Sequence, residues 1–254
     1  MRIRSINTGN IYMQITPASF AFVIWTIIYV WQALWVIYAW SFLCRPWMPR
    51  TIFTGVYIGY TIINILDISW LYIWGNLYVD AASAVLFLFQ VFYYPTLAML
   101  IGYLYKVRSQ AHKIDVLLTW ILPVNGMFIY ATWTTIASLV NLAVVVQYSH
   151  NVSGTTSGTI SLSLLLAALV VYFILENTVF YRFLQYVFTV YPVVIWALSA
   201  VLAAHWGEEG EERNNQFALG LLIITIILFI IRLIIVLIFS IIRPLRKYRK
   251  SQYV

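Results

Sequence analysis

The sequence is poor in charge and has almost no cysteine. Charged residues make up 9% of its 254 residues, whereas soluble domains carry about 25%. Its single cysteine, Cys44, cannot form an internal disulfide and argues against a cysteine-based metal site. Hydrophobic residues reach 63%, which is more than one domain of this length can hide beneath a polar surface. Lipid is therefore predicted to be the solvent for much of the chain.

Familiar catalytic patterns are also missing. The sequence has no glycine-rich phosphate loop, no HExxH and no GxSxG. Its three histidines, His112, His150 and His205, fall in or beside predicted loops without metal-ligand spacing. We predict neither enzyme activity nor a metal site. The net charge of +7 could suggest a nucleic-acid partner, but the positions of the charges favour a membrane protein without one.

Seven long apolar runs are present, and each can supply the roughly 20 residues that a bilayer-spanning helix needs. They cover residues 15–43, 51–74, 81–105, 116–146, 159–175, 183–204 and 217–242. The runs are continuously apolar rather than alternating, which excludes a β-barrel. The sequence predicts an all-α, multi-pass transmembrane bundle of about seven helices, in one domain over residues 1–254. The boundary between the fifth and sixth helices is the least defined.

The connecting segments predict the orientation in the membrane. If the C-terminus is cytoplasmic, eleven basic residues lie inside: Arg45, Arg50, Lys106, Arg108, Lys113, Arg182, Arg243, Arg246, Lys247, Arg249 and Lys250. Only Arg2, Arg4 and Arg213 then lie outside. The acidic loop at 207–213 and the glycosylation sequon at Asn151 also fall outside. We predict an outer or luminal N-terminus, in the plasma membrane or another membrane of the secretory pathway, with the basic tail at anionic headgroups.

A few polar residues lie inside the predicted helices, where they are costly. They are Asn64, Asp67, Gln90, Asn125, Asn141 and Arg232. Asp67 shares a helix face with Asn64, three residues before it. It either forms a ligand or proton site, or makes a hydrogen bond to Asn125 or Asn141 on a neighbouring helix. Arg232 is expected to snorkel to the inner headgroups, with pairing to Asp67 as the alternative.

Aromatic residues are the other strong signal, at 18% of the sequence. Several lie within helices instead of at the interfacial belts: Trp25, Tyr29, Trp70, Trp74, Trp133 and Trp196. They either pack the bundle or wall a cavity for a flat apolar ligand. Prolines in or at the ends of the helices can kink them and open space for such a cavity.

Several of these residues resemble the TspO/MBR (tryptophan-rich sensory protein) family. The first helix carries Pro17, Phe20, Phe22, Trp25 and Tyr29 in the order of the family's opening segment. The second ends with Trp70 and Trp74, where the family has Asn-x-x-Trp-x-x-x-Trp, with Asp67 in place of the asparagine. The fourth has the Trp-x-x-x-Ala-x-x-x-Asn pattern at Trp133, Ala137 and Asn141, and the sixth has a Trp-Ala pair at Trp196.

The resemblance implies a five-helix core that binds porphyrins, sterols or related flat hydrophobic molecules, with extra C-terminal helices in this chain. The predicted ligand-binding residues are Trp25, Tyr29, Asn64, Asp67, Trp70, Trp133 and Asn141. A transporter or channel that uses Asp67 and the intramembrane asparagines is the first alternative, and a seven-helix receptor is the second. The predicted partners are the lipid bilayer and the small ligand, and a monomer and a homodimer both remain open.

Overall fold

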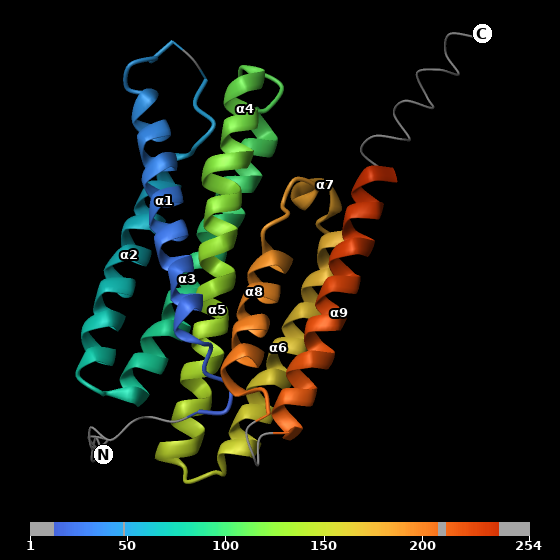
Figure 1. Ribbon diagram of the computed structural model, residues 1–254. Helices are drawn as coiled ribbons and strands as arrows, with labels where there is room; N and C mark the ends of the chain where they lie inside the picture. Colours follow the sequence, from blue (N-terminus) through green and yellow to red (C-terminus); the bar gives the residue numbers. More distant parts are fainter. Residues whose placement is uncertain (1–12, 48, 208–211, 239–254) are drawn as a thin grey trace.

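Helices account for all the regular structure in the described part of the chain. The computed structural model describes residues 13–47, 49–207 and 212–238 (Figure 1). In chain order the helices are η1 (Ser19–Val23), α1 (Ile24–Ser41), α2 (Thr54–Gly75), α3 (Val79–Val107), α4 (Lys113–Thr119), η2 (Trp120–Val124), α5 (Asn125–Val144), η3 (Val145–Ser149), α6 (Gly154–Asn177), α7 (Tyr181–Leu184), α8 (Val190–His205) and α9 (Glu212–Val236).

Six spans in these ranges are long and apolar enough to cross a bilayer. They are η1 with α1, α2, α3, the continuous helix from α4 to η3, α6, and α9 from Arg213. Helix α8 is apolar but shorter, at 16 residues. These helices confirm the predicted all-α, multi-pass membrane bundle.

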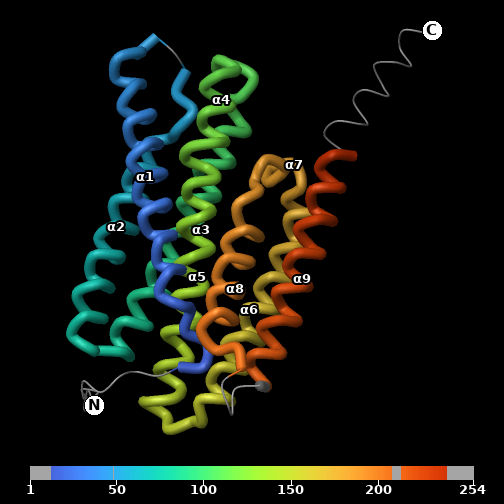
Figure 2. The backbone as a smooth tube through the Cα atoms, viewed as in Figure 1, coloured from blue at the N-terminus to red at the C-terminus, as the bar shows by residue number. Residues whose placement is uncertain are grey.

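The continuous helix from Lys113 to Ser149 is the centre of the bundle. In its most apolar stretch 61% of the residues are buried, against 22–39% in the other five spans. Its α5 segment packs against α1, α3, α6 and α8. Helices α1 to α3 lie on one side of it, and α6, α8 and α9 lie on the other (Figure 2). The protein thus has two groups of helices that share one central element.

The outer faces of the bundle are apolar. On α9, Ile223, Ile227, Ile230 and Ile234 are each about half exposed. Their spacing of three, four and seven residues puts them on one face of the helix. Exposed isoleucines on one helix face would be costly in water and are suited to lipid tails.

The central helix widens at Pro123. Proline has no backbone N–H and cannot continue the regular α-helical pattern of hydrogen bonds. The chain forms one π-helical turn there, η2. Two backbone carbonyls of this turn, from Ile121 and Leu122, accept hydrogen bonds of 3.1 and 3.0 Å from the Trp31 indole. This distortion therefore joins the central helix to α1.

The sixth predicted helix, residues 183–204, is interrupted in the structure. The short helix α7 ends at Leu184, and α8 begins only at Val190, with Pro192 in its first turn. Asn125 of α5 satisfies the non-helical backbone between them: its amide donates to the Tyr186 carbonyl at 2.9 Å and accepts from the Phe188 N–H at 3.1 Å. Buried non-helical backbone is stable in a membrane protein only with such partners.

The other predicted boundaries differ by smaller amounts. The fifth predicted helix, residues 159–175, is longer in the structure and runs from Gly154 to Asn177. It starts earlier because the Ser153 side chain caps it by accepting a hydrogen bond from the Thr156 N–H. The predicted end of the seventh helix, the basic tail after it, most of the acidic loop, and Arg2 and Arg4 lie outside the described residues.

Six of the eight described arginine and lysine residues belong to elements at one end of the bundle. They lie in the loop after α1, at and just after the end of α3, at the start of α4 and in α7: Arg45, Arg50, Lys106, Arg108, Lys113 and Arg182 (Figure 1). Asn151 lies in the turn between η3 and α6 at the opposite end, where α9 also begins and Arg213 is in its first turn. The separation has the pattern of a positive-inside protein.

Candidate ligand-binding site

Trp25 is the centre of an aromatic cluster between α1, α2 and α5. It stacks on Tyr29, one helical turn along α1, with ring centroids 5.6 Å apart. Its ring also stacks on Trp70 of α2 at 6.5 Å and meets the edges of Tyr130 and Trp133 of α5 at 6.0 and 6.4 Å. Because such ring pairs contribute energy beyond their buried area, the cluster holds these three helices together.

A cavity of about 190 Å³ opens beside this cluster. It is lined by Met13, Thr16, Pro17, Phe22, Trp25, Trp70, Trp74, Trp133, Ile136, Ala137, Val140, Asn141 and Val144. Aromatic rings form much of its wall, and the remaining lining is mainly aliphatic. It is therefore suited to a flat apolar molecule.

The structure brings four of the seven predicted ligand-binding residues to this cavity: Trp25, Trp70, Trp133 and Asn141. Tyr29 stacks behind Trp25 and is 48% exposed on the outer side. Asn64 does not reach the cavity, because its amide donates back to the Tyr60 carbonyl of its own helix at 2.7 Å.

Three residues that line the cavity each carry a buried polar atom with no hydrogen-bond partner among the described residues. Two of these atoms are indole N–H donors, on Trp70 and Trp133. The third is the carbonyl oxygen of Asn141, whose amide nitrogen is already used by Ala137 at 2.9 Å. Buried polar groups in native proteins are nearly always satisfied, so three unpaired ones on residues that line a single cavity call for an explanation. A bound molecule with both an acceptor and a donor would satisfy them.

Asp67 lies behind the cavity wall and does not line it. It is buried, at 4% exposure, and its Oδ1 atom has no hydrogen-bond partner in the described chain. It interacts electrostatically with the Tyr130 hydroxyl of α5, which has no hydrogen-bond partner among the residues that the structure describes. The hydrogen bond to Asn125 or Asn141 that the sequence suggested is not observed. Asp67 thus faces the interior of the bundle, between α2 and α5.

Comparison with known proteins gives the family. A family model described as TSPO-like protein matches residues 2–241, nearly the whole chain. The chain belongs to the TSPO-like family. No curated protein and no solved structure matches it. The resemblance predicted from the sequence is confirmed.

The motifs that carried this resemblance have different positions in the TSPO-like chain. Trp133, Ala137 and Asn141 are spaced by four residues along α5 and line the cavity together. Trp196 of α8 does not line it and donates to the Ala21 carbonyl at 3.1 Å. It also packs edge-on against Phe20 at 5.5 Å. The pattern in the central helix therefore marks the cavity, and Trp196 ties α8 to η1.

Arg232 differs from its predicted position and from its predicted partner. It is fully buried and does not snorkel to the headgroups. Its partner is not Asp67 but Glu176 of α6, with Nε 3.3 Å from Oε2. The guanidinium also donates to Asn177 Oδ1 at 2.9 Å and to the Leu184 carbonyl at 2.8 Å. The ion pair holds α6 and α9 together, since a charge this deep requires a partner.

Glu176 was missed because the fifth helix was predicted to end at Leu175. The structure continues that helix to Asn177, which places the Glu176 side chain in the interior, where it also accepts a hydrogen bond from the Tyr191 hydroxyl. A useful signal was available: an arginine in the middle of an apolar helix implies an acid on another helix.

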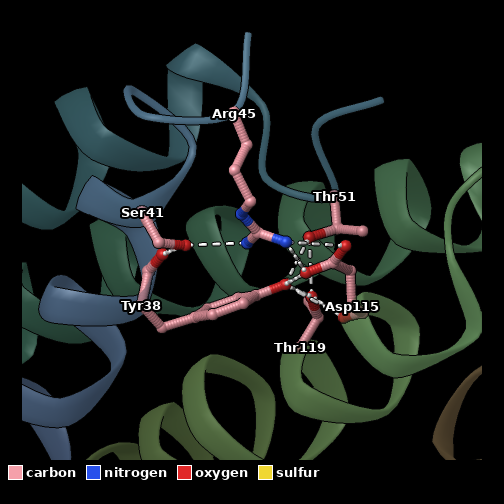
Figure 3. A network of polar contacts seen from close by, with 6 residues as sticks. All are labelled: Tyr38, Ser41, Arg45, Thr51, Asp115 and Thr119. Carbon is pink, nitrogen blue, oxygen red and sulfur yellow. Dashed lines mark hydrogen bonds and ion pairs between the residues drawn. The ribbon is translucent and has the colours of Figure 1, made fainter. Parts of the chain in front are cut away.

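A second polar network fixes the loop between α1 and α2 (Figure 3). Arg45 binds both carboxylate oxygens of Asp115 on α4, at 3.0 and 3.2 Å. The Tyr38 hydroxyl sits between Thr51 and Thr119, at 3.2 and 3.1 Å. Both bonds to Asp115 come from Nη1 of Arg45, and Nη2 donates to the Ser41 hydroxyl at 2.7 Å. Asp115 is 1% exposed, so this ion pair is partly shielded from water. The network fastens the loop to the end of the central helix.

Proposed function

We propose that this TSPO-like protein binds a small, flat hydrophobic molecule in the aromatic cavity and is not an enzyme. The observation that carries the proposal is that three residues lining a mainly apolar cavity each have a buried polar atom with no hydrogen-bond partner in the described part of the chain. Two indole N–H groups and one amide oxygen would orient a ligand, while the aromatic rings would supply the contact area.

The size of the cavity narrows the ligand class. Its volume of about 190 Å³ is below the roughly 300–1,000 Å³ of pockets for drug-sized molecules. A two-ring aromatic molecule with one hydroxyl group suits it, because the hydroxyl can accept from an indole and donate to Asn141. A porphyrin or sterol, the ligands implied by the resemblance, would require the helices to move apart.

Calorimetric titration of the purified protein in detergent tests this proposal, with 2-naphthol as the small probe and a porphyrin as the large one. The blocking variant is Ala137→Phe, which fills the cavity. The matched control is Ala84→Phe, the same change at an exposed position of α3. Saturable binding of 2-naphthol in the native protein and the control, but not in Ala137→Phe, is expected.

Heat that does not saturate, or that is equal in all three proteins, would show partition into the micelle and would overturn the proposal. Circular dichroism establishes that each variant is folded. Saturable binding of the porphyrin as well would show that the cavity widens for larger ligands.

Transport is a second candidate function, favoured by Asp67. An ionisable side chain inside a membrane protein often marks a pathway for a proton or a solute, and the Asp67 carboxylate has an unpaired oxygen. Proteoliposomes distinguish the two functions. Flux of the probe or of protons that is lost in Asp67→Asn supports transport, whereas saturable binding without flux supports a binding or sensing protein.

A further inference from the structure

A second cleft lies between α1 and α2, near the end of the bundle that carries the basic residues. Its volume is about 290 Å³. It is lined by Trp35, Val36, Ala39, Trp40, Phe42, Leu43, Arg50, Tyr57, Tyr60 and Thr61. None of these residues lines the aromatic ligand cavity, so the cleft is a separate site.

The cleft is open on its outer side and aromatic within. Trp35 is buried and meets Tyr60 edge-on, with ring centroids 4.6 Å apart. Trp40 and Leu43, by contrast, are 65% and 71% exposed. In a bilayer these exposed side chains face lipid, so an acyl chain can enter the cleft from the side without crossing the bundle.

Arg50 is the charged residue of this lining. It is exposed and makes no hydrogen bond or ion pair with any described residue. Its charge acts on Tyr57, which also lines the cleft. Arg45, in the same loop, differs because Asp115 neutralises it. The cleft therefore combines apolar walls with an uncompensated guanidinium.

The start of α2 adds to the positive potential there. Arg50 comes four residues before Thr54, where α2 begins. This helix has no side-chain cap on its first N–H groups and no acidic residue in its first turn. The positive end of its dipole is thus not offset locally and favours an anion at the same level.

We propose that this cleft binds an anionic phospholipid, with the phosphate on Arg50 and one acyl chain along Trp35 and Tyr60. An arginine can bind phosphate through two parallel hydrogen bonds, and basic pockets between transmembrane helices hold anionic headgroups in the same way. The apolar walls select a lipid over free phosphate, because one exposed arginine in water gains little from an inorganic ion. The site does not depend on the proposed ligand cavity.

Native mass spectrometry of the protein in detergent tests the proposal. Phosphatidylglycerol and phosphatidylcholine with identical chains are the lipid probes, and inorganic phosphate is the competitor. Arg50→Gln removes the charge, whereas Lys113→Gln removes a charge at the same end but outside the cleft. Thr61→Trp fills the cleft from an exposed position and leaves Arg50 in place.

The native protein and Lys113→Gln are expected to retain phosphatidylglycerol in preference to phosphatidylcholine. Arg50→Gln should lose about five-fold in affinity for phosphatidylglycerol alone, as expected for one basic residue. Thr61→Trp should weaken retention of both lipids. Equal losses in Arg50→Gln and Lys113→Gln, no preference for the anionic lipid, or displacement of the lipid by millimolar phosphate would each overturn the proposal.

Discussion

Trp35 and Trp133 show how much the surroundings of one side-chain type decide its role. Both are buried tryptophans in the bundle. The indole of Trp35 donates to Gln32 Oε1 and completes a hydrogen bond inside the protein. The indole N–H of Trp133, a residue that lines the cavity, has no partner in the described residues. The first indole stabilises the fold, and the second is the donor that we propose for a bound molecule.

Exchange of each indole for a ring without an N–H separates these roles. Trp133→Phe should weaken binding of 2-naphthol by about 1 kcal/mol, roughly five-fold in Kd, because one hydrogen bond is lost. Both variants lose ring contacts, but only Trp35→Phe also breaks an internal hydrogen bond, so Trp133→Phe should lose less thermal stability than Trp35→Phe. Trp35→Phe should leave the binding of 2-naphthol unchanged. Calorimetry and thermal unfolding in detergent measure the two effects, and an equal stability loss with unchanged binding in Trp133→Phe would assign its indole to packing.

Asp67 gives a prediction for pH dependence. Asp67→Asn restores the residue that the family pattern has at this position and keeps the side-chain shape, so the protein should remain folded. Any pH dependence of ligand binding or flux should disappear in this variant, because Asp67 is the carboxyl group beside the aromatic cluster. The control is His150→Gln, at an exposed loop position. A pH profile that survives Asp67→Asn and vanishes in His150→Gln would make Asp67 a structural residue.

At the scale of helices, the Glu176–Arg232 pair should decide whether α6 and α9 stay together. Glu176→Gln or Arg232→Met alone should lower the free energy of unfolding by about 3–5 kcal/mol, because each leaves a buried charge without its partner. The double variant Glu176→Gln with Arg232→Met should recover much of this loss. Arg182→Gln, at an exposed position of α7, is the control. Denaturation in mixed micelles measures the free energy of unfolding of the native protein and the four variants.

If the double variant were as unstable as the sum of the two single variants, the charges would not act as a pair. Recovery in the double variant, with weakened transport or binding, would instead show that the pair has a role beyond the packing of α6 against α9.

For the whole molecule, the sequence predicted what depends on composition and missed what depends on contacts between distant residues. Long apolar runs predicted the membrane bundle, and the resemblance of the Trp133–Asn141 segment to the TspO/MBR family pointed to residues that line the cavity. The break before α8 was not predicted, because it is stabilised by Asn125, more than sixty residues away. The ion pair of Arg232 was missed because the fifth helix was predicted to end two residues too early, which left out its partner Glu176. The indole N–H groups of Trp70 and Trp133 have no partner among the described residues, and this follows from three-dimensional packing alone.

The orientation of the bundle remains a prediction with a direct test. Asn151 is exposed and has a left-handed backbone conformation, with φ of +56°, which asparagine adopts more readily than most residues. Expression in a eukaryotic host should give a glycosidase-sensitive mass shift that is absent in Asn151→Gln. A tag at the C-terminus should be cleaved by protease in inside-out vesicles. A protected tag, or a glycan at a residue other than Asn151, would show that the predicted orientation is wrong.

The length of the central helix has a consequence for how it sits in the membrane. At 37 residues, the helix from Lys113 to Ser149 extends about 55 Å, well beyond the roughly 30 Å hydrocarbon thickness of a bilayer. The loop anchored by Arg45 and Asp115 sits at one end of this helix and keeps it from fraying there. The polar ends of the helix, which carry Lys113 and Gln147, must therefore reach past the hydrocarbon into the headgroup region.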